Sequence, residues 1–427
     1  MSASSKQERL HSTLTKLLTQ IPHRTIAFLA CVLVLVGMYL SRAMMSIGMM
    51  VLIGNALINH QVVSYWKSFR RQPHLLILSL YFLYAALSVF WSTDKPYYLQ
   101  RMQVLLPFLT LPFAFISIGK WENKWVHLLL LLFVVLNVGG IGWSLIQYYS
   151  DKQAFDAGYH YSHQIPTPFK RDHIRFSLSV VMSILFCIRL LKHARQVGYK
   201  MMLAMIIILD VLYLHILSVK SGLIAFYIVA ALQIGYALWH QSTRRWGALA
   251  VCGLIILPLV MYYTSVTFRT KIGYVLYSIQ QIQNDKKEVN ISDEGRLISY
   301  GYALELISEH PVSGVGYGDV FEEMRRKFDR DFGVGKIYPL IPHNQFLMSS
   351  VALGLPGGIL ILLIFVLLWR QVRKQDFVFA CFMTLMTFAC VIEAFFENQY
   401  GVCLFLFFLL LLIQRKHPID SDTPRQV

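Results

Sequence analysis

The sequence predicts an all-α integral membrane protein with about twelve transmembrane helices and a helical cap outside the membrane. Of its 427 residues, 56% are hydrophobic and only 15% are charged, whereas about 25% are charged in an average globular domain. A soluble fold could not bury that much apolar surface, so lipid must solvate much of the chain. The apolar residues also occur in runs of about twenty, the length of a helix that crosses a bilayer.

The predicted spans follow one another almost from end to end. They are 24–41, 44–63, 74–92, 102–118, 124–149, 173–191, 200–219, 221–240, 246–264, 346–369, 377–396 and 399–413. Ser221-Gly222 is the single turn signal between the seventh and eighth spans, and the last span is short. The basic N-terminus runs into the first span without a small-residue cleavage site, so we expect this helix to be retained.

The distribution of lysine and arginine predicts the orientation, because these residues accumulate in short cytoplasmic loops. With a cytoplasmic N-terminus, 21 of the 39 fall on the inner side and 18 on the outer side. Ten of the outer ones lie in the long segment 265–345, which this rule does not count. We therefore expect both termini in the cytoplasm and the long segment on the outer side of a bacterial inner membrane, facing the periplasm.

The long segment divides the chain into three parts. Spans one to nine occupy 1–264, the periplasmic cap occupies 265–345, and spans ten to twelve with a cytoplasmic tail occupy 346–427. Apolar residues recur at helical spacing in three stretches of the cap, which predicts helices over 269–283, 293–309 and 319–331. A second outer loop, 150–172, is rich in Tyr, His and Pro, which fits either an interfacial aromatic belt or a sugar-contacting role.

His343 is the principal candidate for chemistry. It lies in Ile341-Pro342-His343-Asn344-Gln345-Phe346, where the cap re-enters the membrane. Imidazole is the side chain best matched to general-base work near pH 7. A lone histidine at a membrane entry is more often structural, so both interpretations stay open at this point.

Four outward-facing cations accompany this histidine in the predicted topology: Arg171, Arg175, Lys220 and Arg296. Cations at outer helix ends run against the positive-inside trend. They are either anchors at the membrane surface or a cluster that binds a phosphate, since arginine binds phosphate through two parallel hydrogen bonds. Acidic residues give weaker signals: Asp210 lies inside the seventh span, and Glu393 and Glu397, at the outer end of the eleventh, could balance the cationic cluster or contact substrate.

Several other functions are disfavoured by the sequence. The six cysteines lie in apolar stretches without metal-ligand spacing, so no metal site and no cofactor are expected. The net charge of +16 sits in short loops between apolar runs, so no nucleic-acid partner is expected. The stretch from His310 to Gly318 is glycine-rich but lacks the Gly-Lys-Ser/Thr of a nucleotide-binding loop, and a tight turn explains it.

Taken together, four elements resemble the O-antigen ligase/polymerase superfamily of bacterial membrane glycosyltransferases. They are Gly295-Arg296, the stretch 310–316 (His-Pro-Val-Ser-Gly-Val-Gly), Pro342-His343-Asn344, and the position of the large outer loop. Ligases of this superfamily carry His-Asn, nine residues, then Gly-x-x-Gly, and His343-Asn344 is followed after nine residues by Gly354-Leu355-Pro356-Gly357. One departure is Lys220, because relatives often have Ser-Arg-Gly at this turn.

The resemblance implies an O-antigen ligase. Such an enzyme transfers a glycan from undecaprenyl diphosphate to lipid A–core oligosaccharide, without metal or ATP, within a membrane of lipids. It implies His343 as general base, with Arg296, Lys220 and Arg171 or Arg175 binding the donor diphosphate, and Asn344, Tyr317 and Gly316 as supporting residues. A polymerase with the same donor is an alternative, although no outer-loop arginine shows the Arg-x10-Gly pattern of polymerases. A transporter is a second alternative, although the halves show no internal repeat.

Overall fold

The computed structural model describes residues 22–119, 121–159, 164–283 and 292–414, and within these ranges the chain folds into helices without strands. Nine helical segments are long and apolar enough to cross a membrane, among the residues described. They are α2 (His23–Leu40), α5 with η1 (Pro73–Phe90), α6 (Lys95–Ile118), α7 (Asn123–Ser150), α10 (His173–His193), α11 (Val197–Leu217), α12 (Lys220–Trp239), α13 (Arg244–Thr264) and α17 (Gln345–Val372). This confirms an all-helical membrane protein.

The other three predicted spans are helical but differ from simple transmembrane helices. Helix α3 (Arg42–Leu57) is followed by α4 (Val62–Arg70) after a bend of 104°, so the predicted span 44–63 crosses an elbow. Helices α18 (Phe377–Ile392) and α19 (Gln399–Ile413) have only 16 and 15 residues and are joined through η3 (Phe395–Glu397). The count of twelve spans therefore stays a prediction.

Helix α19 is short because it lies inside the bundle. Every residue from Tyr400 to Leu412 is buried. Phe408 packs against Phe133 of α7 and Phe186 of α10, with ring centroids 4.5 Å and 5.0 Å apart. A helix surrounded by protein contacts other side chains rather than lipid, so its apolar length need not match the bilayer. Helix α13 shows the opposite case, with most of its side chains exposed where lipid would contact them.

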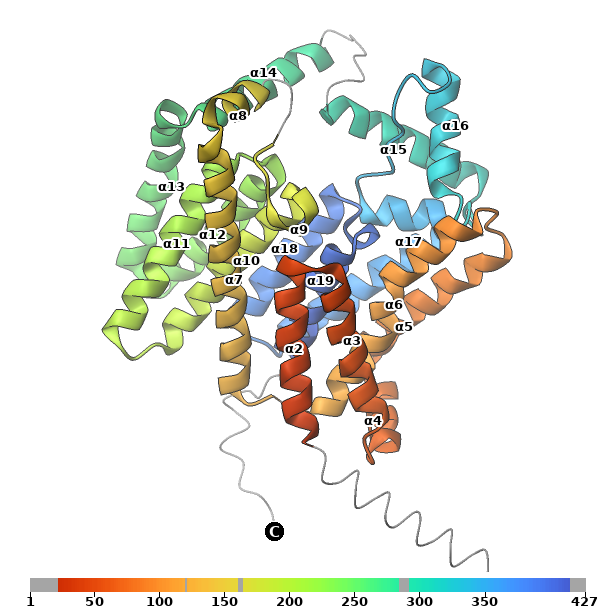
Figure 1. Ribbon diagram of the computed structural model, residues 1–427, viewed down its shortest axis with the longest axis horizontal. Coiled ribbons are helices and arrows are strands. Elements are labelled where there is room, and N and C mark those ends of the chain that lie inside the picture. The colour runs from red at the N-terminus through yellow and green to blue at the C-terminus, as the bar shows by residue number, and fades with distance from the viewer. Residues whose placement is uncertain (1–21, 120, 160–163, 284–291, 415–427) are drawn as a thin grey trace, which may run out of the picture.

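The cap contains α14 (Val266–Gln283), α15 (Ser292–Glu309) and α16 (Val320–Phe332), as the sequence predicts. These helices and α8 (Lys152–Gly158) lie at one end of the molecule, and α4 lies at the other (Figure 1). Helices α15 and α16 are held together by ion pairs from Lys327 to Glu305 and Glu309, at 2.8 Å and 2.6 Å. Phe328 packs on Tyr302 beneath these charges.

The loop between α15 and α16 is inserted into a break in α17. Gly354 has φ of +72° inside this helix, which interrupts its hydrogen bonding. The loop supplies the missing partners: the N–H groups of Val315 and Gly316 donate to the carbonyls of Val351 and Ala352, both at 2.9 Å. In return, the Leu355 N–H donates to the Pro311 carbonyl at 2.8 Å. The glycine-rich stretch 310–318 therefore bonds to the part of α17 that contains the Gly-x-x-Gly motif, and this contact between residues 311–316 and 351–355 is called the joint below.

This joint has no room for side chains at its two central glycines. A Cβ atom on Gly314 would lie 2.4 Å from the Gly354 nitrogen, and a Cβ on Gly354 would lie 2.4 Å from the Val312 carbonyl oxygen. Both residues also have positive φ, which glycine adopts readily and other residues rarely do. The nine residues between Asn344 and Gly354 are therefore the part of α17 that precedes the break.

Candidate active site

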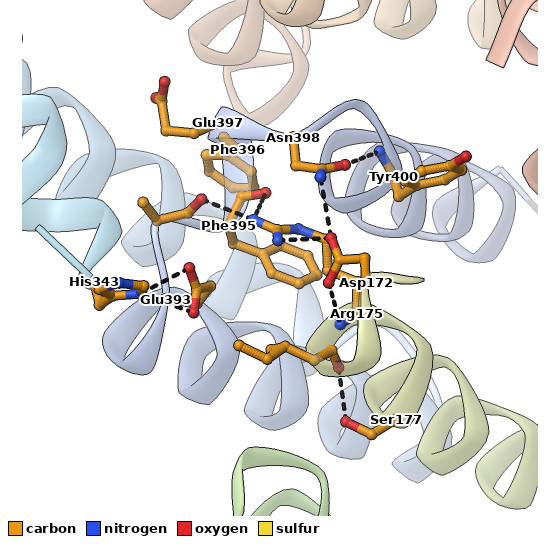
Figure 2. Close-up of polar contacts among 12 residues, drawn as sticks. Asp172, Arg175, Ser177, His343, Glu393, Phe395, Phe396, Glu397, Asn398 and Tyr400 are labelled. Carbon is orange, nitrogen blue, oxygen red and sulfur yellow. Dashed lines mark hydrogen bonds and ion pairs between the residues drawn. The ribbon is translucent and has the colours of Figure 1, made fainter. Parts of the chain in front are cut away.

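His343 is held directly above the N-terminus of α17 and paired with a carboxylate. Its Nδ1 lies 3.0 Å from Glu393 Oε1 and 3.1 Å from Oε2 (Figure 2). The Tyr300 hydroxyl of α15 donates to the His343 carbonyl at 2.8 Å, which ties the cap to this residue. With Nδ1–H donated to the carboxylate, Nε2 is the nitrogen that can accept a proton. The His343 side chain is 20% exposed, so the imidazole remains accessible.

Asn344 caps the N-terminus of α17, which explains why an asparagine follows His343. Its side-chain oxygen accepts hydrogen bonds from the N–H groups of Phe346 and Leu347, at 2.9 Å and 3.0 Å, and so caps α17. Its amide nitrogen donates to the Val391 carbonyl at 3.0 Å, in the last turn of α18. Asn344 therefore fixes the start of α17 against the end of α18, which places His343 and Glu393 together.

Glu393 also faces Arg296 of α15, with 3.8 Å between Oε2 and Nη2. The Glu393 side chain is buried, whereas that of Arg296 is 27% exposed. A buried carboxylate needs compensating partners, and here a histidine and a cap arginine provide them. Arg296 thus combines a salt bridge at the floor of the cap with a guanidinium that is open to a ligand.

Arg175 holds the connection between α18 and α19 from the other side. Its Nη1 donates to Asp172 Oδ2 at 2.9 Å, and its Nη2 donates to the Ala394 carbonyl at 3.0 Å. Asn398 donates to the same Asp172 oxygen at 3.0 Å. Because Ala394 follows Glu393 directly, this buried network fixes the backbone that carries the carboxylate.

Gln345, the first residue of α17, also contacts the connection between α18 and α19. Its side-chain oxygen accepts a hydrogen bond from the Phe396 N–H at 2.7 Å, and its amide donates to Ser349 at 3.2 Å. Ser349 in turn contacts the Tyr81 hydroxyl of α5, which is 2.5 Å from the hydroxyl of Tyr317. Tyr317 is fully buried in this chain of hydrogen bonds. Gly316, with φ of +91°, belongs to the joint with α17.

The remaining sequence candidates lie at the edge of this arrangement. Lys220 begins α12, and its ammonium lies 5.2 Å from the centre of the Tyr274 ring of α14. A Cβ on Gly222 would meet Ser177 of α10 at 2.4 Å, so the first turns of α10 and α12 are in close contact. The backbone of Arg171 belongs to α9 (Pro168–Arg171), but its side chain lies outside what the structure describes.

The structure therefore gathers three of the sequence candidates, His343, Arg296 and Arg175, around the short segment 393–395. It also adds Asp172 and Arg101, to which the sequence gave no role, and supplies a partner for Glu397, which the sequence suggested could balance the cations. Asp172 emerges as the partner of Arg175. Glu397 emerges as the partner of Arg101 of α6, whose Nη1 donates to the Glu397 carbonyl at 2.8 Å. The only sequence signal for these pairs was that acids and cations occur at the same predicted end of several spans.

These features define a multi-pass membrane protein with a partly buried His–Glu pair and a partly exposed arginine of α15 beside it. Residues 202–362 match the family model described as O-Antigen ligase. The match covers 161 of the 427 residues, and it supports the resemblance to the O-antigen ligase superfamily and a glycosyltransferase-like membrane enzyme. It contains Lys220, Arg296 and His343, whereas Arg175 and Glu393 lie outside it. No match was found among curated proteins.

Proposed function

We propose that this chain is an O-antigen ligase. It transfers a glycan from undecaprenyl diphosphate to a hydroxyl of lipid A–core oligosaccharide, at the outer face of a bacterial inner membrane. The observation that carries this proposal is the His343–Glu393 pair beside Arg296, within a chain whose motif after His343-Asn344 has the ligase spacing. The proposal extends the family assignment to a particular donor and acceptor.

His343 has the geometry of a general base. In the proposed step, its Nε2 removes the proton of the acceptor hydroxyl while the acceptor oxygen bonds to the anomeric carbon. The bond between that carbon and the phosphate oxygen breaks, and undecaprenyl diphosphate leaves with the electron pair. Glu393 keeps the proton on Nδ1, so that Nε2 presents its lone pair, and stabilises the imidazolium that forms. A single displacement inverts the anomeric configuration.

The cations have different tasks in this proposal. Arg296 is partly exposed and lies beside the pair, so it stabilises the negative charge that develops on the departing diphosphate. Lys220, at the N-terminus of α12, adds a second positive charge, and Arg171 remains a candidate for the same role. Arg175 is buried and already donates to Asp172 and Ala394. We therefore assign it to positioning the Glu393 segment, whereas the sequence alone suggested diphosphate binding.

The test is a transfer assay with purified protein, lipid-linked glycan and rough lipopolysaccharide, without ATP and with excess EDTA. We expect a ladder of glycosylated lipopolysaccharide with inverted linkages. His343→Ala should lower the rate by about 10²–10⁴-fold, the usual contribution of a general base. His310→Ala, which removes an exposed cap histidine, is the matched control and should leave the rate unchanged.

Four outcomes would contradict parts of this proposal. Glycan that lengthens on the lipid carrier would identify a polymerase. Retention of the anomeric configuration would exclude the single displacement. Loss of transfer in EDTA that is restored by a divalent cation would contradict the metal-independent mechanism. Movement of lipid-linked glycan across vesicles without a covalent product would favour a transporter.

A further inference from the structure

A cavity of about 500 Å³, with mostly polar lining residues, is bordered by the start of α2 and by the α3–α4 elbow. Helix α4 lies at the end of the molecule opposite α14, α15 and α16 (Figure 1). Three elements surround it: the start of α2, the elbow between α3 and α4, and the end of α6. Its lining includes Arg24, His23 and His60, and no lining residue described in the structure is acidic. Among the described residues, the lining therefore combines the positive charge of Arg24 with polar side chains and contains no carboxylate.

The elbow supplies neutral hydrogen-bonding groups to the same cavity. Asn59 is buried and accepts a hydrogen bond from the Gln61 N–H at 2.9 Å, which shapes the turn before α4. Gln61 also accepts from the Tyr65 hydroxyl at 3.0 Å, so both side chains are held at the cavity wall. On the opposite wall, His23 is fixed by a 2.8 Å contact with Asn55 of α3. These contacts show a wall whose polar groups are already oriented.

Helix α4 places this cavity at the membrane surface. It turns by 104° from α3, so it runs along the bilayer plane when α3 crosses the membrane. Phe69 is buried against Phe113 of α6, while Val63 and Trp66 are 64% and 47% exposed. Its last turn carries Lys67 and Arg70. Exposed apolar side chains beside basic ones are typical of a helix that rests at the interface with lipid headgroups.

We propose that the cavity between α2, the α3–α4 elbow and α6 binds the phosphate headgroup of an anionic membrane lipid. Arg24 pairs with the phosphate, His60 and the elbow side chains donate to its oxygens, and the acyl chains lie along Val63 and Trp66. The site is separate from the proposed glycosyl-transfer site, because it lies at the other end of the molecule. It therefore stands whether or not the chain is a ligase.

The experiment measures lipid binding by the full-length purified protein in detergent. Phosphatidylglycerol, phosphatidylethanolamine and inorganic phosphate are titrated separately, with thermal unfolding and native mass spectrometry as readouts. We expect phosphatidylglycerol to raise the unfolding midpoint and to be retained as a bound lipid. Arg24→Gln should weaken this binding about fivefold, since a basic residue at an anionic membrane contributes about 1 kcal/mol and 1.4 kcal/mol is tenfold.

Arg245→Gln is the matched control, because Arg245 is an exposed arginine near the N-terminus of α13 that does not line the cavity. Equal weakening by both variants would overturn the site in favour of general charge attraction. Equal retention of phosphatidylethanolamine would overturn the requirement for an anionic lipid. If inorganic phosphate alone produced the full shift, the cavity would be a site for free phosphate, and the lipid assignment would fail. Circular dichroism of each variant verifies that the helices remain folded.

Discussion

The carboxylate of Glu393 accepts the Nδ1–H of His343, 50 residues earlier in the chain, at 3.0 Å. The pair depends on two separate supports: Asn344 holds the α17 side, and Arg175 holds the α18–α19 side. Because the carboxylate selects which imidazole nitrogen carries the proton, the relationship determines whether Nε2 can act as a base.

Glu393→Gln should lower kcat by up to about 10⁴-fold, as when the carboxylate that orients a general-base histidine is replaced by an amide. An amide can donate as well as accept, so it no longer forces the proton onto Nδ1. KM for both substrates should change little, because Glu393 is buried beneath His343. Steady-state kinetics of the transfer reaction measure both constants. An increase in KM at constant kcat would instead identify Glu393 as a substrate-binding residue.

Arg175→Lys should disturb the site although the charge is kept. Lysine cannot bind Asp172 and the Ala394 carbonyl with the planar fork of arginine. Losing one charged hydrogen bond costs about 1.5–3 kcal/mol, so the unfolding midpoint and kcat should both fall. Arg325→Lys, at an exposed ion pair of α16, is the control and should have no measurable effect. An unchanged kcat in Arg175→Lys would contradict the positioning role.

Gly354→Ala should destabilise the joint between the cap loop and α17. A residue with a Cβ atom is strained at positive φ, at a cost of about 1–3 kcal/mol, and the new atom would collide with the Val312 carbonyl. Thermal unfolding in detergent should show the loss. Gly139→Ala in α7 serves as the control, because a Cβ there meets nothing within 4 Å. Equal stability of the two variants would mean that the joint does not hold the cap.

The ion pairs between α15 and α16 should survive mild acid. Hydrogen bonds from Arg330 and Lys327 lower the pKa of Glu305 to about 2. A carboxyl group with a depressed pKa contributes stability that is complete above its unfolded value and is lost as pH falls towards the folded one. The contribution of Glu305 should therefore persist at pH 5–7 and disappear between about pH 4.5 and pH 2. Hydrogen exchange of α15 in wild type and Glu305→Gln checks this, and an equal pH response in both would contradict it.

Much of the helical architecture follows from the sequence because length and apolarity are local properties. Each predicted apolar run is helical, and the three cap helices fall within a few residues of their predicted positions. The elbow after α3 was not predicted, although Asn59-His60-Gln61 interrupt the apolar run 44–63 at the bend, because hydropathy averaged over a span does not register a change of direction. The sequence indicates that the last span is short, but not that α19 is enclosed by other helices, because enclosure depends on tertiary packing.

The candidate site also has a part that the sequence indicates and a part that only the structure shows. The sequence indicates His343 through the chemistry of imidazole and the His-Asn motif, and Arg296 as one of the outward-facing cations. It does not indicate that Glu393 is their common partner, because the contact depends on how α17 and α18 meet. Nor does it reveal that Tyr317 and Gly316 serve the cap joint and its hydrogen bonds rather than the immediate surroundings of His343. Those contacts join segments far apart in the chain, which no local pattern records.

The break in α17 has a consequence for how the protein is made. A bilayer offers no water to backbone groups, so an interrupted helix requires partners from elsewhere in the protein. Here these partners are the main-chain groups of residues 311–316, which precede α17 in the chain. Since synthesis proceeds from the N-terminus, the segment that completes the helix leaves the ribosome before the helix itself. Residues 311–316 have therefore already been synthesised when the interrupted helix enters the lipid and requires their hydrogen bonds.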